Sequence, residues 1–140
     1  DMWIDHVALN CVQTTHYPRI SIFARIGSAW FFHPLEDARS ELQKLLSYYL
    51  KGMTEPLKFF LQTSAKYGER FLRNGRHEEA LQAARVDWEG SDFSRGERDD
   101  HYYKLCFRHI DPLDDTFASI AVDIFRFLNT HREKMAKQKR

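Results

Sequence analysis

The segment from residue 19 to residue 62 constrains the fold most, because its patterns follow one another in a fixed order. Residues 19–26 alternate in hydrophobicity from one position to the next, which is typical of a strand. A glycine and a serine at 27–28 favour a tight turn, and the aromatic run 29–33 is expected to return as a second strand. The alternation predicts four apolar side chains on the covered face of the first strand: Ile20, Ile22, Ala24 and Ile26.

A helix and a further strand are predicted after this hairpin. Residues 37–51 place apolar side chains at helical spacing, and Gly52 suits the position just after a helix. Residues 57–61 are a short apolar run between chain breakers and are expected to form a strand. This order predicts an α/β (α+β) fold with a small, mainly antiparallel sheet, hairpin 19–33 plus strand 57–61, flanked by helices. The buried stripe of the helix is expected to be Ala38, Leu42, Leu45, Leu46 and Tyr49.

The rest of the chain is predicted to be mostly helical, with glycines and prolines at the boundaries. Helices are expected at residues 2–12, 63–73, 76–89, 100–109 and 113–134, with a polar loop at 91–98. The final helix carries a long apolar stripe, which is expected to be buried and to hold the fold closed. Its members are Leu113, Phe117, Ile120, Ala121, Ile124 and Leu128, and burial is expected above all for Phe117, Ile120, Ile124 and Leu128.

Composition limits the class of protein. The chain has 140 residues, 43% of them hydrophobic, which is enough for a single folded domain over residues 1–140. Its 21 basic and 20 acidic side chains argue against a strongly basic, free-standing nucleic-acid module. Cys11 and Cys106 are interpreted as free thiols in a reducing compartment, so a cytoplasmic protein is expected. No apolar run reaches the ~20 residues of a membrane helix, and the missing initiator Met indicates a fragment of a longer subunit.

The predicted order of elements resembles the centre of the PD-(D/E)xK nuclease fold, in which two strands carry the acidic residues and the lysine of a Mg²⁺ site. The matching positions here are residues 21–23 and 31–33, and neither contains a carboxylate. No lysine in the chain has an acidic residue two positions before it, so the (Glu/Asp)-x-Lys motif is absent. Because Mg²⁺-dependent phosphodiester cleavage needs carboxylate ligands, we interpret the chain as a degenerate, catalytically inactive nuclease-like domain.

Other catalytic and ligand-binding motifs are absent or incomplete. The sequence contains no phosphate-binding glycine loop and no GxSxG motif. His101, Cys106 and His109 have the composition of half a zinc site, but no second pair of suitable spacing completes it. No catalytic residue, metal ligand or cofactor is therefore predicted.

The stretch from residue 95 to residue 104 is the strongest candidate for a contact surface. It combines dense charge of both signs with two tyrosines, and Arg and Tyr are enriched at protein interfaces. We expect the arginines to pair with neighbouring carboxylates, Gly96 to supply a special backbone angle, and one tyrosine to pack inward. The alternative is a solvated loop followed by an N-capped helix. The candidate partner surface consists of Arg95, Gly96, Glu97, Arg98, Asp99, Asp100 and Tyr103.

Several stretches together resemble one known family. They lie at residues 3–7, 52–57, 88–90, 95–100 and 103–108, and they read WIDHV, GMTEPL, WEG, RGERDD and YKLCFR. In order and spacing they resemble the C-terminal domain of RecC, the gamma subunit of exodeoxyribonuclease V (the RecBCD helicase–nuclease), over nearly all of the chain.

The resemblance implies a non-catalytic domain that helps to assemble this complex and to channel its DNA strands. It implies RecB-like and RecD-like subunits as partners in a heterotrimer, with DNA reached through the parent complex, in double-strand-break repair and homologous recombination. Two other functions remain open. One is a single-stranded DNA binding module in which Trp30, Phe31 and Phe32 stack on bases, and the other is an active nuclease with an atypical site.

Overall fold

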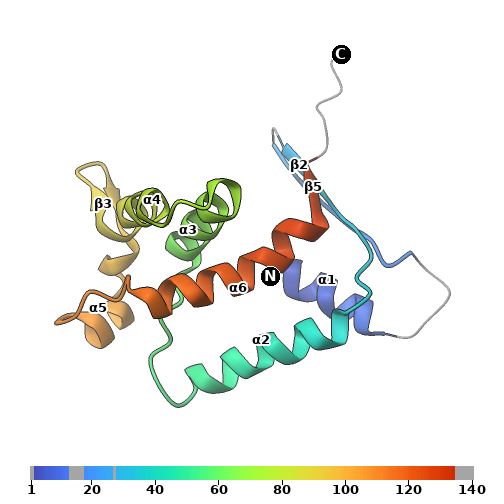
Figure 1. The fold of residues 1–140 in the computed structure, drawn as a ribbon, viewed down its shortest axis with the longest axis horizontal. Helices are drawn as coiled ribbons and strands as arrows, with labels where there is room; N and C mark the ends of the chain where they lie inside the picture. Colours follow the sequence, from blue (N-terminus) through green and yellow to red (C-terminus); the bar gives the residue numbers. More distant parts are fainter. Residues whose placement is uncertain (1, 13–17, 27, 135–140) are drawn as a thin grey trace. The chain divides into compact units, whose positions relative to one another are not determined.

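The computed structural model describes residues 2–12, 18–26 and 28–134. This part of the chain contains six α-helices and two small antiparallel sheets, so the fold is mixed α/β as predicted (Figure 1). The chain forms two compact units, which we call unit 1 (residues 1–51 and 127–140) and unit 2 (residues 52–126). Among the described residues, no helix is long and apolar enough to cross a membrane.

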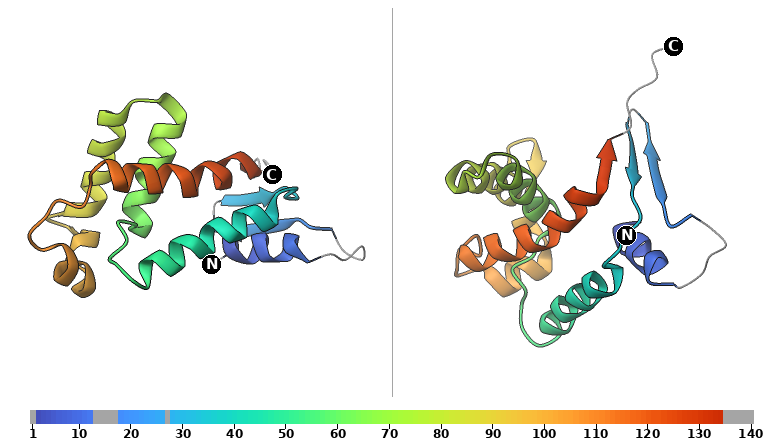
Figure 2. Two further views of the ribbon diagram at one scale, coloured as in Figure 1. Left: turned by 60° about the horizontal axis from the view of Figure 1, so that its bottom comes forward. Right: turned by 45° about the vertical axis from the view of Figure 1, so that its right-hand side comes forward.

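Unit 1 is built around a three-stranded antiparallel sheet. Its elements are α1 (Met2–Cys11), β1 (Ser21–Arg25), β2 (Ser28–Phe32), α2 (Ala38–Gly52), the end of α6 (Asp115–His131) and β5 (Arg132–Lys134). The strand order is β1-β2-β5, so the C-terminal strand lies beside the second strand of the hairpin (Figure 2). The two predicted strands of the hairpin are thus confirmed, whereas Ser28, expected in the turn, begins β2, and Gly27 lies outside the described residues.

The third strand of this sheet is not the predicted one. Residues 57–60 form no strand, and Leu61 begins a helix. A short apolar run is compatible with a strand or with the entry to a buried helix, and here the fully buried Phe60 lies just before the helix. The predicted helix 113–134 ends earlier, at His131, because residues 132–134 pair with β2 as β5.

The face of β1 that was expected to be covered is the open one. Ser21 lies opposite Phe32 in the ladder, so the two side chains project from the same face. Phe32 is buried in the core of unit 1, whereas Ile22 is 56% exposed and Ile26 fully exposed. Since β1 carries apolar side chains on both faces, as Phe23 shows, alternation alone could not identify the inner one.

His6 connects three elements of unit 1. It is fully buried, its Nδ1 accepts a hydrogen bond from the Ser21 hydroxyl at 2.9 Å, and its Nε2 donates to the His33 carbonyl at 2.9 Å. On the same helix, the Asn10 side-chain oxygen accepts from the Leu35 N–H at 2.9 Å. These contacts fix α1 against the hairpin and the start of α2. The apolar core around them consists of Trp3, Val7, Phe32, Leu35 and Ala38.

The expected stripe of α2 is buried only at its beginning. Ala38 is buried and Leu42 packs partly against the core, but Leu46 is 50% and Tyr49 64% exposed. The helix also includes Gly52, which therefore does not occupy the position after the helix.

Unit 2 is a cluster of helices around Phe60. Its further elements are α3 (Leu61–Asn74), α4 (His77–Glu89), β3 (Gly90–Ser91), β4 (Ser94–Arg95), the 3-10 turn Glu97–Asp99, α5 (His101–Phe107) and most of α6. The ring of Phe60 lies 4.4 Å from that of Trp88 and 5.0 Å from that of Tyr103, measured between centroids. Gly75 has the left-handed conformation (φ 68°) that ends α3, as its sequence position predicted.

The apolar stripe of α6 is only partly as predicted. Phe117 and Ile120 are buried, whereas Ile124 and Leu128 are half-buried and Phe125 is buried in their place. Gly68 explains the burial of Phe125, because a Cβ on Gly68 would lie 2.8 Å from the Phe125 Cβ. The two helices α3 and α6 therefore approach closely at this glycine.

Candidate partner-binding surface

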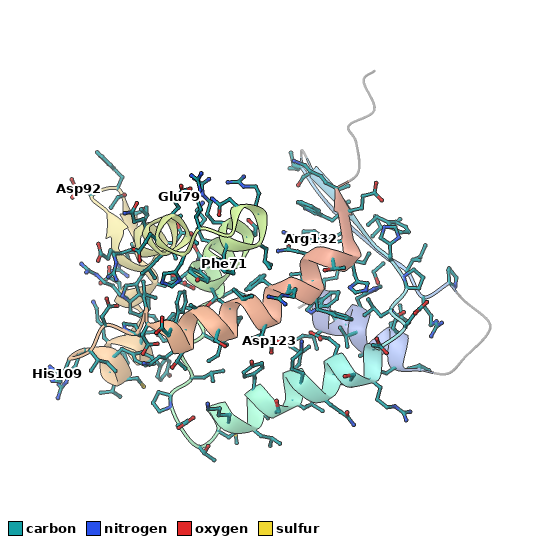
Figure 3. All side chains as sticks on the ribbon, in the orientation of Figure 1. Phe71, Glu79, Asp92, His109, Asp123 and Arg132 are labelled. Carbon is teal, nitrogen blue, oxygen red and sulfur yellow. The ribbon has the colours of Figure 1, made fainter. Side chains whose placement is uncertain are left out.

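The segment after α4 forms a short hairpin where a loop was predicted at residues 91–98. Gly90 ends α4 with a φ of 76°, and β3 pairs with β4 through Gly90 opposite Arg95 and Ser91 opposite Ser94. Only Asp92 and Phe93 lie between the paired residues, so they form the tip. Figure 3 shows Asp92 at the outer end of this hairpin, away from the helices of unit 2.

Gly96 serves the hairpin through its small size. Its φ of −79° and ψ of 161° are ordinary extended values, so the predicted special backbone angle is wrong. Gly96 is buried, and a Cβ there would lie 2.3 Å from the Trp88 carbonyl oxygen. A Cβ on Gly90 would in turn lie 2.3 Å from the Gly96 nitrogen. The two backbones touch at these glycines, which fixes the base of the hairpin on the end of α4.

Glu97 binds the start of α3. Its carboxylate oxygens accept hydrogen bonds from the N–H groups of Gln62 at 2.9 Å and Thr63 at 2.7 Å. Phe60, at the N-cap position of α3, has no side-chain acceptor to offer. Glu97, which is distant in the sequence, therefore provides the negatively charged cap that the residues at the start of α3 do not provide.

Asp100 and Tyr103 also hold the fold. Asp100 is the N-cap of α5 and accepts from the N–H groups of Tyr102 at 2.9 Å and Tyr103 at 3.3 Å. Tyr103 packs against the core, and this burial raises its pKa, an effect that the charge of Glu97 reinforces. Tyr102 is 74% exposed, so the expectation of one inward and one available tyrosine is confirmed.

The expected pairing of the arginines with neighbouring carboxylates does not occur. Asp99 instead binds the Lys104 ammonium at 2.9 Å, and this hydrogen bond lowers the pKa of the Asp99 carboxyl. Within the described part of the chain, Arg95 and Arg98 form no ion pair, and both are exposed. Their charges help to lower the pKa of the Asp99 carboxyl through space, but neither guanidinium group is held in an ion pair, so both can contact a partner.

Phe93 is the residue of this surface that the sequence-based prediction missed. It is 99% exposed at the hairpin tip. With both arginines it lines an open hollow of about 540 Å³, whose remaining wall includes Glu89 and Asp99. The available signal was a single aromatic residue in a polar stretch bounded by glycines 90 and 96.

The three residues considered as half of a zinc site, His101, Cys106 and His109, lie in or just after α5. Cys106 is an exposed free thiol. Across residues 2–12, 18–26 and 28–134, no group of three or more His, Cys, Asp or Glu side chains is placed to hold a metal ion.

A comparison with protein-family models identifies the family. The model described as the RecC C-terminal domain matches residues 1–72, which is just over half of the 140 residues. The chain belongs to the RecC C-terminal domain family. No curated protein matches it by sequence.

The match to the RecC C-terminal domain covers the first part of the fold. It includes α1, the β1–β2 hairpin, α2 and most of α3. The β3–β4 hairpin and residues 95–103 lie beyond residue 72, and so do the stretches of the sequence resemblance after residue 57. The family assignment therefore rests on residues 1–72, which are the N-terminal part of unit 1 and the start of unit 2, and the argument for the candidate surface comes from its geometry alone.

Proposed function

We propose that this chain is a non-catalytic assembly domain of the RecC subunit of an exodeoxyribonuclease V, the RecBCD helicase–nuclease of double-strand-break repair and homologous recombination. The observation that carries the proposal is the match of residues 1–72 to the RecC C-terminal domain. In this function the domain docks RecB-like or RecD-like subunits of the heterotrimer and helps to channel DNA strands in the assembled complex.

The proposal includes the absence of catalysis, and the β1–β2 hairpin supports this part of it. β1 and β2 contain no Asp or Glu, so these strands offer none of the oxygen ligands that a nuclease uses for Mg²⁺. We also propose that the fold is a degenerate relative of the PD-(D/E)xK nucleases. The hairpin followed by α2 agrees with that origin, whereas the third strand, β5, comes from the C-terminal end of the chain.

The surface proposed for docking is the exposed part of residues 95–99. Arg95 and Arg98 are exposed and form no ion pair within the described residues, and Arg is enriched at interfaces. A partner carboxylate would form a charge-assisted, bidentate contact with either guanidinium. Removing one side of such a pair from a desolvated interface costs about 2–5 kcal/mol.

A substitution experiment in the full-length subunit tests this function. Arg95, Arg98 and Asp99 are changed to Ala, and the dissociation constants for purified RecB-like and RecD-like subunits are measured. The matched control changes Arg73 and Arg76, two exposed arginines at the turn between α3 and α4. We expect weaker binding of at least one partner for the first variant alone, with melting temperatures close to that of the wild type. Unchanged affinity for both partners would contradict the proposal.

A second candidate is a single-stranded DNA contact on unit 1. Phe32, one of the three aromatic residues considered for stacking, is buried and cannot serve. Trp30 is half-buried, with the Arg132 guanidinium 4.6 Å and the Lys134 ammonium 5.8 Å from its ring centroid. Aromatic and basic side chains together are typical of single-strand binding. This function predicts binding that weakens steeply with salt and weakens further on Lys134→Ala, measured by fluorescence anisotropy.

A further inference from the structure

The tip of the β3–β4 hairpin presents an aromatic ring that is almost fully exposed to solvent. Phe93 is 99% exposed, more than any other aromatic residue among the exposed large hydrophobic side chains of the described chain. Single exposed apolar residues are common on protein surfaces. Phe93 differs because it stands alone at the end of a projecting hairpin, with charged side chains beside it.

The hairpin is held in a fixed shape. The close approach of Gly90 and Gly96 leaves no room for a Cβ at either position. The base of the hairpin can therefore move only if the backbone segments at these two glycines lose their contact. The Ser91 and Ser94 hydroxyl oxygens are 3.0 Å apart across the turn, and the Phe93 N–H donates to the Ser91 hydroxyl at 3.3 Å. A side chain on such a rigid element loses less conformational entropy when it binds, which is the usual advantage of a preorganised anchor.

The charges beside Phe93 indicate the kind of partner. Of the acidic groups in the hollow, Asp99 is bound by Lys104, and Glu89 lies 3.5 Å from Arg85. Arg95 and Arg98 form no ion pair among the described residues and act on Asp99 only through space, so their exposed guanidinium groups remain able to bind carboxylates on the opposite surface. A phosphate backbone is a continuous row of negative charges and would also have to pass Glu89, Asp92 and Asp99, which line the same hollow, whereas a protein partner can place single carboxylates opposite the two guanidinium groups alone.

We propose that Phe93 is the anchor of a protein–protein contact. Its ring enters an apolar pocket on the partner, and Arg95 and Arg98 meet carboxylates on the rim of that pocket. A central aromatic anchor in a pocket, with a polar rim around it, is the usual arrangement of an interface hot spot. This inference rests on the proposed assembly function and names the chemistry that the partner subunit must offer.

The experiment uses the full-length subunit and measures its dissociation constants for purified RecB-like and RecD-like subunits. The variants are Phe93→Ala, Phe93→Leu, and Arg95→Glu with Arg98→Glu. Tyr102→Ala is the matched control, because Tyr102 is an exposed aromatic residue of the same unit that lies outside the hairpin. The melting temperature of each variant is also measured, and because the Phe93 side chain is 99% exposed, both Phe93 variants should melt at the same temperature as the wild type.

We expect Phe93→Ala to weaken binding of one partner about 30-fold, which is the effect of a hot-spot residue. Phe93→Leu should retain part of the affinity. The double charge reversal should weaken binding more at low salt than at high salt, and Tyr102→Ala should change the affinity less than about 3-fold.

If the wild type binds its partners and Phe93→Ala binds them equally well, the anchor is refuted while the assembly function stands. If the wild type binds neither subunit, the assembly function itself fails and the anchor with it. A loss confined to single-stranded DNA binding would also overturn the anchor.

Discussion

Glu97 and Asp100 are single residues that tie the charged segment to the fold. Each carboxylate accepts N–H groups at the start of a helix: Glu97 at α3 and Asp100 at α5. Arg98, which lies between them, has no ion-pair partner among the described residues. Glu97 and Asp100 therefore stabilise the fold, whereas Arg98 does not, and single substitutions should show this difference in stability.

We predict that Glu97→Ala lowers the free energy of unfolding by about 1–2 kcal/mol, and Asp100→Ala by about 1 kcal/mol, because each removes a helix cap. Arg98→Ala should change it by less than about 0.5 kcal/mol, as is usual for a surface side chain without partners. Urea denaturation followed by circular dichroism measures all three. Equal destabilisation by Arg98→Ala and Glu97→Ala would contradict this division of roles.

The two caps differ in how far the sequence could reveal them. Asp100 was accessible to sequence reasoning, because Asp at the start of a predicted helix is a local signal. Glu97 was not, because Thr63, which it caps, is 34 residues away. Gly96 was singled out for its backbone angle, but the cause is the nearby Trp88 carbonyl oxygen, and only the folded chain brings that atom close.

His6 makes the stability of unit 1 depend on pH. Burial lowers the pKa of His6 below its usual value of 6.5; the hydrogen bond to the His33 carbonyl opposes this shift, and His131 adds to it. In the unfolded chain His6 takes up a proton near pH 6.5, at which the folded chain still resists protonation. His6 therefore contributes stability above this pH, and the contribution is lost as the pH falls through about 6.5 toward the lower pKa of the folded state.

We predict that the free energy of unfolding decreases between about pH 7.5 and 5.5, and that His6→Gln makes this decrease smaller. Denaturation curves at several pH values give both slopes. A variant with the same pH dependence as the wild type would show that other groups cause it.

Among the secondary-structure elements, the helices were predicted more accurately than the strands. Helix signals are local, such as the apolar stripe of α4 and the Asn74–Gly75 end of α3. The pairing of β5 with β2 joins distant parts of the chain, and the side chains of His33 and Glu133, which lie 3.3 Å apart there, are 100 residues apart in the sequence. No local pattern in residues 132–134 indicates that partner, so the strand was read as the end of a helix.

The stripe of α6 predicts a graded response to truncation of its side chains. Phe117 is fully buried against the rings of Phe60 and Tyr67, at centroid distances of 6.0 and 5.4 Å. Phe117→Ala should therefore cost about 3–5 kcal/mol, the usual value for a buried Phe. Leu128 is only half-buried, so Leu128→Ala should cost less, about 1–2 kcal/mol. Urea titrations of both variants measure the difference, and equal costs would contradict the burial described here.

For the whole molecule, we predict that the chain does not cut DNA. The strands β1 and β2 lack carboxylates, and no acidic-x-Lys motif occurs in the sequence. Linear duplex and single-stranded DNA should remain intact with Mg²⁺ or Mn²⁺, as judged by gel electrophoresis beside an active nuclease. Cleavage that disappears when a single Asp or Glu is replaced would show that an atypical active site exists.

The central claim, that this chain assembles a RecBCD-type complex, is tested most directly by measuring the mass of that complex. The full-length subunit and a version lacking these 140 residues are each mixed with RecB-like and RecD-like subunits and analysed by mass photometry. We predict that the shortened subunit, still folded by circular dichroism, loses at least one partner at concentrations where the full-length subunit forms the heterotrimer. A complete heterotrimer of unchanged affinity without this domain would contradict the account.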